Sequence, residues 1–217
     1  MNKALRFIFA LLILASASVT WAQNEEVTHR RVSATGTLAS SDVYSIEGAF
    51  HYMFFPYLGV GGAFGYWANY YDNGWASGDD WNIDDDDNKP SNLYLRPSVI
   101  LKTPPIRIRA TEWSLYAEPG LMLNVPYQRV RIEKTNRWPV TEYGYASTNK
   151  GQWLAVDLRA GISVQIGPCG ITAGYLMSNF DIYSQYRHLK YHGESFEKFY
   201  PGKSFMQGAF LSLSYDF

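Results

Sequence analysis

The sequence lacks three features that would point to other classes of protein. It contains a single cysteine, Cys169, so no internal disulfide can form. We interpret Cys169, in the turn Gly167–Gly170, as a tolerated turn residue rather than a reactive thiol. The formal net charge of −1 is nearly balanced and no basic stripe is present, which argues against nucleic-acid binding. Past the N-terminus, no run approaches the roughly eighteen consecutive apolar residues of a membrane-spanning helix.

The N-terminus has the layout of a secretory signal peptide. Lys3 and Arg6 precede the apolar run Phe7–Leu14, and small residues follow. We predict a signal peptide over residues 1–22, with Ala17–Ser18 as a second candidate cleavage point, and one mature domain over residues 23–217. Removing residues 1–22 leaves 17 basic and 20 acidic residues, a net charge of −3.

Aromatic residues are unusually frequent. They make up 17% of the chain and include 17 Tyr and 7 Trp. Aromatic rings with one polar end gather at membrane–water interfaces, so this composition suits a protein with two such interfaces. Any membrane span of the mature chain must then be built from strands.

The C-terminal stretch, KSFMQGAFLSLSYDF, shows the clearest strand pattern. Apolar residues occupy every second position, which places them on one face of a strand. The stretch resembles the closing strand of bacterial outer-membrane β-barrels, whose terminal aromatic residue and alternating apolar positions are read by the barrel insertion machinery. The resemblance implies an insertion signal at Leu211, Leu213, Tyr215 and Phe217. The alternative is an edge strand of a secreted β-sandwich.

Alternation with a period of two predicts eight strands. The weakest pattern is that of the first strand, and Pro119 within the fifth predicts a local bulge. The inward positions of the third strand are mostly glycine or alanine, which leaves room for neighbouring side chains. The predicted strands are Val32–Ala39, Val43–Phe54, Tyr57–Tyr70, Asn92–Lys102, Trp113–Val125, Gln152–Ile166, Ile171–Tyr183 and the C-terminal strand.

Long and short connections alternate between these strands. The long ones are Tyr71–Ser91, Pro126–Gly151 and Ser184–Gly202, and the short ones are Phe55–Pro56, Thr103–Pro105 and Gly167–Gly170. Outer-membrane barrels have this asymmetry, with short periplasmic turns and long external loops. We therefore predict an all-β fold, a closed antiparallel eight-stranded transmembrane β-barrel with an up-and-down meander. This topology requires the weak first strand, and the turn Ser40–Asp42 becomes a fourth external connection.

If the apolar sets face lipid, several charged residues face a narrow lumen. An eight-stranded barrel is just wide enough for side chains to fill it. Unpaired buried charge is costly, so we expect these residues to pair and to plug the barrel, with a selectivity lining as the alternative. The predicted lumen ionic network is Glu47, Arg96, Glu118, Asp157 and Arg159.

Signals for an enzyme or a metal site are weak. His51 shares a strand face with Glu47 but is too far from it for a direct hydrogen bond, and no cluster with metal-ligand spacing is present. We predict no catalytic residues, no cofactor and no bound metal. The first long loop is acidic and invites a calcium hypothesis, against the alternative of a solvated loop. The residues of this possible cation-binding loop are Asp79, Asp80, Asp84, Asp85, Asp86 and Asp87.

The other two long loops suggest surface contacts. Loop Pro126–Gly151 is basic and could pair with the acidic loop or with anionic lipopolysaccharide. Loop Ser184–Gly202 is aromatic and suggests either an interfacial girdle or a sticky external patch. The aromatic residues in question are Tyr183, Tyr186, Tyr191, Phe196, Phe199 and Tyr200.

The whole mature chain resembles the small outer-membrane barrels abundant in Bacteroidetes-like Gram-negative bacteria, similar in architecture to OmpA-type and OmpX-type barrels. The resemblance is carried by the signal peptide, the strand patterns GVGGAFGYW and AEPGLMLNV, and the terminal YDF. It implies a protein of the cell outer membrane, with outer-membrane lipid, lipopolysaccharide and the insertion machinery as partners. Our first hypothesis is a monomeric, non-enzymatic barrel whose external loops contact partners or lipopolysaccharide. A narrow transport or small-ligand channel is the second hypothesis, and a lipid-modifying membrane enzyme is the third.

Overall fold

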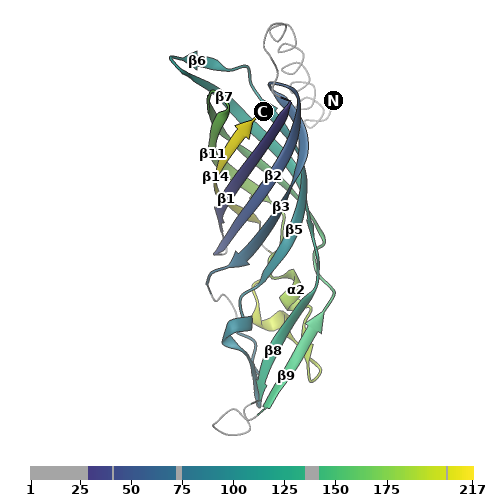
Figure 1. Cartoon of the computed structure of the whole chain (residues 1–217). Helices are drawn as coiled ribbons and strands as arrows, with labels where there is room; N and C mark the ends of the chain where they lie inside the picture. The colour runs from purple at the N-terminus through teal and green to yellow at the C-terminus, as the bar shows by residue number, and fades with distance from the viewer. Residues whose placement is uncertain (1–28, 41, 72–74, 135–141, 204) are drawn as a thin grey trace, which may run out of the picture.

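The computed structural model of the chain is an elongated β-structure (Figure 1). It describes residues 29–40, 42–71, 75–134, 142–203 and 205–217. The predicted signal peptide lies outside these residues. Among them, no helix has the length and apolar character of a membrane-crossing segment.

Eight strands of the described chain close into an antiparallel barrel, as predicted. Each strand pairs with the strands on either side, and the circle closes where the first strand meets the last, with Val32 opposite Tyr215. In chain order the barrel strands are β1 (Arg30–Ala39), β2 (Val43–Phe55), β3 (Leu58–Asn69), β5 (Ser91–Lys102), β7 (Thr111–Asn124), β10 (Leu154–Ile166), β11 (Cys169–Ser178) and β14 (Met206–Asp216). The weakly patterned first strand is thus confirmed, and Cys169 begins a strand instead of lying in a turn.

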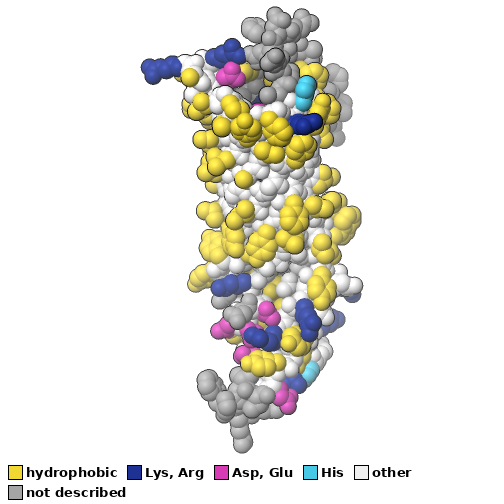
Figure 2. Space-filling model, in the orientation of Figure 1, with side chains coloured by type: hydrophobic (Ala, Val, Ile, Leu, Met, Phe, Trp, Pro, Cys, Tyr) yellow, Lys and Arg dark blue, Asp and Glu magenta, His cyan; other side chains and the backbone are white. Residues whose placement is uncertain are grey.

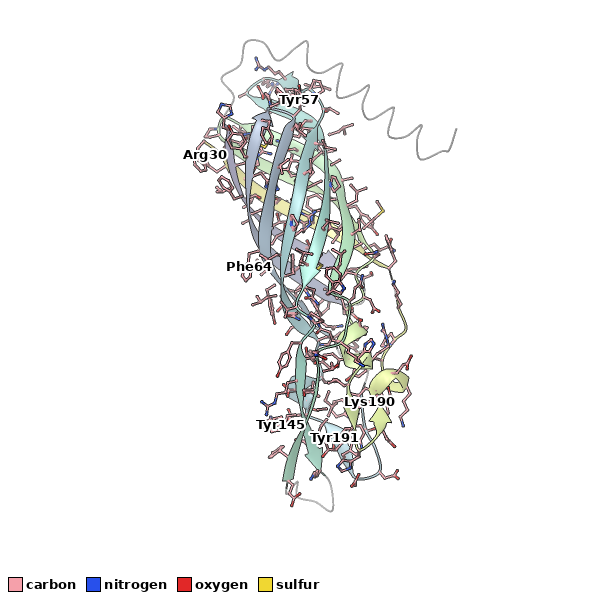
Figure 3. All side chains as sticks on the ribbon, turned by 90° about the vertical axis from the view of Figure 1, so that its right-hand side faces the viewer. Arg30, Tyr57, Phe64, Tyr145, Lys190 and Tyr191 are labelled. Atoms are coloured by element: carbon pink, nitrogen blue, oxygen red, sulfur yellow. The ribbon has the colours of Figure 1, made fainter. Side chains whose placement is uncertain are left out.

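The barrel is apolar outside and polar inside. Leu211, Leu213 and Tyr215 are about half exposed, at 53%, 56% and 49%, whereas Glu47 and Arg159 are each only 3% exposed. Hydrophobic side chains gather in belts toward the two ends of the visible wall (Figure 2). Phe64, on β3, points away from the wall (Figure 3). Because a strand alternates its side chains between two faces, one sequence supplies both surfaces.

Proline interrupts the pairing of β5 with β7 without shifting it. Ser98 lies opposite Gly120 and Leu101 opposite Ala117, in the same register on both sides of Pro119. The predicted bulge at Pro119 is therefore wrong: without an N–H, proline omits a hydrogen bond but needs no extra residue. The register shifts instead between Met53 and Phe55 in β2, next to the turn into β3.

The three long connections fold together at the end of the barrel opposite Arg30 and Phe217 (Figure 1). We call this assembly the cap. It contains a three-stranded sheet in the order β4 (Trp81–Ile83), β8 (Gln128–Lys134), β9 (Glu142–Thr148). β8 pairs antiparallel with β9 beyond the barrel, and we call this pair the β8–β9 hairpin. The remaining cap elements are η2 (Asp85–Asp87), α2 (Ser184–Arg187), β12 (Lys190–Tyr191), β13 (Glu194–Ser195) and η3 (Phe196–Phe199).

At the other end, the connections between strands are short. The exception is β6 (Ile106–Ile108), which pairs with the start of β7 as a small hairpin projecting from the barrel rim (Figure 1). Since β1 begins and β14 ends here, we call it the terminal end.

The orientation of the wall predicts a depth-dependent cost of charge. Leu211→Arg, at the middle of β14, should destabilise the protein in lipid vesicles by about 2–4 kcal/mol, because the guanidinium would face acyl chains near the midplane. Leu38→Arg, near the cap end of β1, is the matched control and should cost no more than about 1 kcal/mol. Equilibrium denaturant unfolding in phosphatidylcholine vesicles measures both, and equal costs would contradict this orientation.

Candidate functional site

The centre of the barrel lumen holds the five charged residues singled out in the sequence. They come from four strands: Glu47 from β2, Arg96 from β5, Glu118 from β7, and both Asp157 and Arg159 from β10. All five point inward and are nearly fully buried. The structure brings them together into one connected network of hydrogen bonds, which we call the lumen network.

Arg96 is the hub of the lumen network. Its Nε donates to both carboxylate oxygens of Asp157 at 3.0 and 2.9 Å, and its Nη2 donates to Asp157 Oδ1 at 2.5 Å. Its Nη1 donates to Glu118 Oε1 at 2.6 Å. The planar guanidinium therefore bridges β7 and β10, in the fork geometry that makes arginine suited to carboxylates.

Arg159 is the second arginine of the lumen network and pairs with the two glutamates, which come from β2 and β7. Its Nη1 forms a salt bridge with Glu47 and lies 3.9 Å from Glu118 Oε2. Two tyrosine hydroxyls satisfy the remaining carboxylate oxygens: Tyr94 donates to Glu47 at 2.9 Å and Tyr116 donates to Glu118 at 2.6 Å. Each buried carboxylate thus has several donors, which is the condition for burying charge at tolerable cost.

Glycine creates the space for these side chains. A Cβ at Gly65 would lie 2.3 Å from the ring carbon Cζ of Tyr94, and one at Gly120 would lie 2.8 Å from the guanidinium of Arg96. Neither position could carry a larger residue without moving the network. The small inward residues of β3 therefore have the role predicted for them, which is to make room in a narrow lumen.

The lumen is filled on both sides of the network. Toward the cap there remains a cavity of about 20 Å³, enough for about one water molecule. Toward the terminal end lies an apolar layer of Met53, Ile100, Tyr116 and Phe210. The lumen network and the apolar layer together fill this section of the described barrel with buried side chains.

A second ion pair joins the first and last strands near the terminal end, and it was missed in the sequence. Arg31 Nε and Nη2 donate to the two oxygens of Asp216, each at 2.5 Å, and Gln165 Nε2 donates to Asp216 at 2.8 Å. Arg31 lies directly opposite Asp216 where β1 meets β14. The alternation of each strand already places both residues inward. That they lie opposite each other could not be predicted, because it depends on the register in which β1 pairs with β14.

The cap shares one hydrophobic core with the mouth of the barrel. The rings of Trp81 and Phe196 stack with centroids 5.3 Å apart, and Tyr200 packs edge-on against Tyr186 at 5.0 Å. Burial, with Tyr200 and Asp87 nearby, raises the pKa of Tyr186 well above its usual value. The predictions of an interfacial girdle or a sticky patch for these aromatics are therefore wrong. Tyr183, Tyr186, Phe196 and Tyr200 are buried, and Tyr191 and Phe199 are partly buried against them.

The acidic loop is tied to the basic loop. Arg131 donates from Nε to Asp84 at 2.8 Å, which raises the pKa of the guanidinium, and its backbone N–H donates to Asp87 at 2.6 Å. This pairing is one of the two alternatives given for the basic loop. Asp79, Asp80 and Asp85 are exposed, and the side chain of Asp86 lies outside what the structure describes. Within the described residues, no three His, Cys, Asp or Glu side chains form a group able to hold a metal ion.

His51 lies inside the sealed lumen. It is 1% exposed, and its Nε2 is 2.8 Å from Ser98 Oγ and 3.6 Å from Glu118 Oε1. Ser98 in turn donates to Glu118 at 2.7 Å. These three residue types occur in hydrolases, but here the surrounding layers keep substrate away.

The C-terminal residues line the outer wall as described above, and Phe217 is also half exposed. The backbones of Phe217 and Arg30 exchange hydrogen bonds at 2.8 and 3.0 Å. The last residue is thus part of the seam that closes the barrel.

No protein-family model matches this chain, and no curated protein matches it in sequence. Solved structures do match in fold. A major outer membrane protein from Thermus thermophilus matches with a TM-score of 0.51 at 12% identity, over 87% of this chain and 98% of that one. The N-terminal β-barrel domain of Pseudomonas aeruginosa OprF gives 0.41 at 10% identity, over 87% and 96%. The outer membrane enzyme PagL gives 0.38 at 12% identity, over 86% and 99%.

The fold is that of the small eight-stranded outer-membrane barrels. Together with the apolar outer wall, it supports localisation in the outer membrane. Outer-membrane barrels have short turns in the periplasm and long loops outside the cell. The terminal end of this barrel, with its short turns, therefore faces the periplasm, and the cap faces outward.

Breaking the lumen network should destabilise the barrel strongly. Arg96→Leu leaves Asp157 and Glu118 buried without their main partner and should cost about 3–5 kcal/mol of unfolding free energy. Arg107→Leu is the control: it removes the exposed pair with Glu112, 2.8 Å long, and should cost at most about 1 kcal/mol. Denaturant unfolding in detergent measures both, and a loss for Arg96→Leu no larger than that of the control would count against the network.

Proposed function

We propose that this protein is a non-enzymatic cell-surface barrel that uses its cap to contact lipopolysaccharide, while its lumen stays closed. The observation that carries the proposal is the combination of a charge-filled barrel with a folded cap. A channel needs the reverse, an open lumen under loops that leave the mouth free. The signal peptide over residues 1–22, a monomeric state and membership of the Bacteroidetes-like barrels are part of the same proposal and rest on the sequence.

The cap carries a surface suited to anionic groups. On the outer face of the β8–β9 hairpin, the guanidinium of Arg129 lies 4.1 Å from the ring centre of Tyr145, and that of Arg131 lies 5.1 Å from that of Tyr143. Both tyrosines are 57% exposed. We call these four residues the arginine–tyrosine stripe.

Charge singles out Arg129 within the stripe. Arg131 is already paired with Asp84, whereas no acidic side chain of the described chain forms an ion pair with Arg129. A guanidinium stacked on a ring keeps its N–H edge free for a phosphate or carboxylate. Tyr145 lies on the side of the hairpin away from Tyr191 (Figure 3), so the stripe faces outward. Lipopolysaccharide presents phosphate and carboxylate groups at this level of the surface.

The two alternatives have less support. The filled lumen argues against a transport channel. An enzyme acting on lipid needs its reactive groups at the outer wall or rim, whereas His51 and Ser98 are enclosed in the lumen. His188, in the cap, forms a hydrogen bond with the backbone of α2, the helix just before it: its Nδ1 lies 2.6 Å from the carbonyl oxygen of Ser184.

Electrical recording tests the closed lumen. The refolded protein in planar bilayers should give no stepwise single-channel current, because no water-filled path crosses the lumen network. A porin inserted in the same bilayers is the positive control. Reproducible unitary steps that disappear when the protein is omitted would favour the channel.

Binding to deacylated lipopolysaccharide tests the stripe. Calorimetric titration of this soluble fragment should show affinity that falls as salt rises, and Arg129→Ser should weaken it by roughly tenfold through loss of a charge-assisted contact. Lys198→Ser is the matched control, an exposed basic residue of η3 outside the stripe. An equal loss in both variants, or none in either, would remove the stripe from the proposal.

A further inference from the structure

A separate pocket opens at the terminal end of the barrel, between the apolar layer and the periplasm. It has a volume of about 440 Å³, within the range of pockets that hold small molecules. Its walls include Met53, Pro56, Pro105 and Pro168. Its polar groups come from five of the eight barrel strands and from Tyr57 and Thr103. It lies apart from the stripe, at the opposite end of the molecule.

Two hydrogen-bond donors line this pocket. Tyr57 immediately precedes β3, and its carbonyl accepts a bond of 2.8 Å from the backbone N–H of Lys102. The two residues thus continue the β3–β5 ladder, in which Leu58 lies opposite Leu101. Both occupy inward positions of that ladder, and both line the pocket. Side chains directly opposite on one face of a sheet are neighbours, so the ammonium and the phenol point into the same space.

Neither donor is satisfied by the described chain. The hydroxyl of Tyr57 is buried and has no hydrogen-bond partner. No carboxylate of the described residues forms a salt bridge with Lys102. Burying a donor without a partner costs free energy, so the Tyr57 hydroxyl is best explained by an acceptor that is not part of the described chain. Lys102, which is only partly buried, supplies a positive charge beside it.

The other charges of the pocket are already matched. Asp216 is held by both nitrogens of Arg31, and Glu112 accepts from Arg107 at the rim at 2.8 Å. Gln165 donates to Asp216 and to the carbonyl of Gly167. Lys102 is therefore the one lining charge without a counter-charge among the described residues, and the pocket favours an anion.

We infer that the pocket is a binding site for a small periplasmic solute that carries an oxyanion, a phosphate or carboxylate, with Lys102 and Tyr57 as its ligands. The oxyanion accepts from the Lys102 ammonium and the Tyr57 hydroxyl. The proline and methionine walls contact the carbon part of the solute. The apolar layer closes the lumen on the cap side of the pocket. The site therefore binds its ligand from the periplasm and does not pass it through the barrel.

Titration of the refolded chain, starting at Gln23, with inorganic phosphate and separately with acetate tests this site. In low-salt buffer, the backbone amide NMR signals of Lys102 and Tyr57 should shift saturably with at least one anion, and the comparison separates phosphate from carboxylate. Lys102→Met should weaken binding by roughly tenfold or more, and Tyr57→Phe by several-fold. Lys102→Arg should retain binding, since it keeps the charge.

Lys150→Met is the matched control, because it removes an exposed lysine at the cap end. Unchanged circular dichroism and heat-modifiable gel mobility show that each variant is folded. The site is disproved if neither anion saturates the signals, or if Lys102→Met binds as tightly as the unaltered chain. Equal weakening by Lys150→Met would reduce the effect to general electrostatic attraction. None of these outcomes depends on whether the cap binds lipopolysaccharide.

Discussion

The structure depends on one interaction, the placement of Arg96 and Arg159 among three buried carboxylates. A barrel wall that faces lipid sends its polar residues inward, and an eight-stranded barrel has no room to hydrate them. The charges must then satisfy one another, and four strands contribute to that arrangement. The network therefore fills the space that the wall encloses, and fixes the strands that supply it.

The same logic extends to both ends of the barrel. At the cap end, Trp67 at the barrel mouth packs against Phe180, with ring centroids 5.2 Å apart, and Asn69 donates to the hydroxyl of Tyr183 at 2.6 Å. The cap is thus continuous with the lumen packing and is not a set of independent loops. At the terminal end, Arg31 and Asp216 join the first and last strands, but the pocket beside them is left open. The two proposed recognition surfaces, on the β8–β9 hairpin and in the terminal pocket, therefore both lie outside the section of the lumen that side chains fill.

The barrel and the lumen network could be predicted from the sequence, because the residues of a strand alternate between the face toward lipid and the face toward the lumen. The inward positions of Glu47 and Arg159, and the outward positions of Leu211 and Leu213, follow from parity alone. The need for a first strand followed from topology even where its own pattern was weak.

The arrangement of the cap could not be predicted, because Trp81 and Phe196 are far apart in sequence and no periodicity relates them. Arg31 and Asp216 were missed for a similar reason: which residues meet at the seam depends on register. At Pro119, a sequence rule about proline overestimated the disturbance, since the barrel tolerates missing hydrogen bonds between β5 and β7.

The most direct test of the account is spin labelling along β14 in lipid vesicles. Single cysteines from Gly208 to Tyr215, in a chain with Cys169 replaced by serine, would each carry a nitroxide whose collision rate with dissolved oxygen is measured. The account predicts a period of two, with high oxygen accessibility at Leu211, Leu213 and Tyr215 and low accessibility at Ser212 and Ser214. An inverted pattern, or uniform accessibility along the strand, would contradict a lipid-facing apolar wall around a sealed charged lumen.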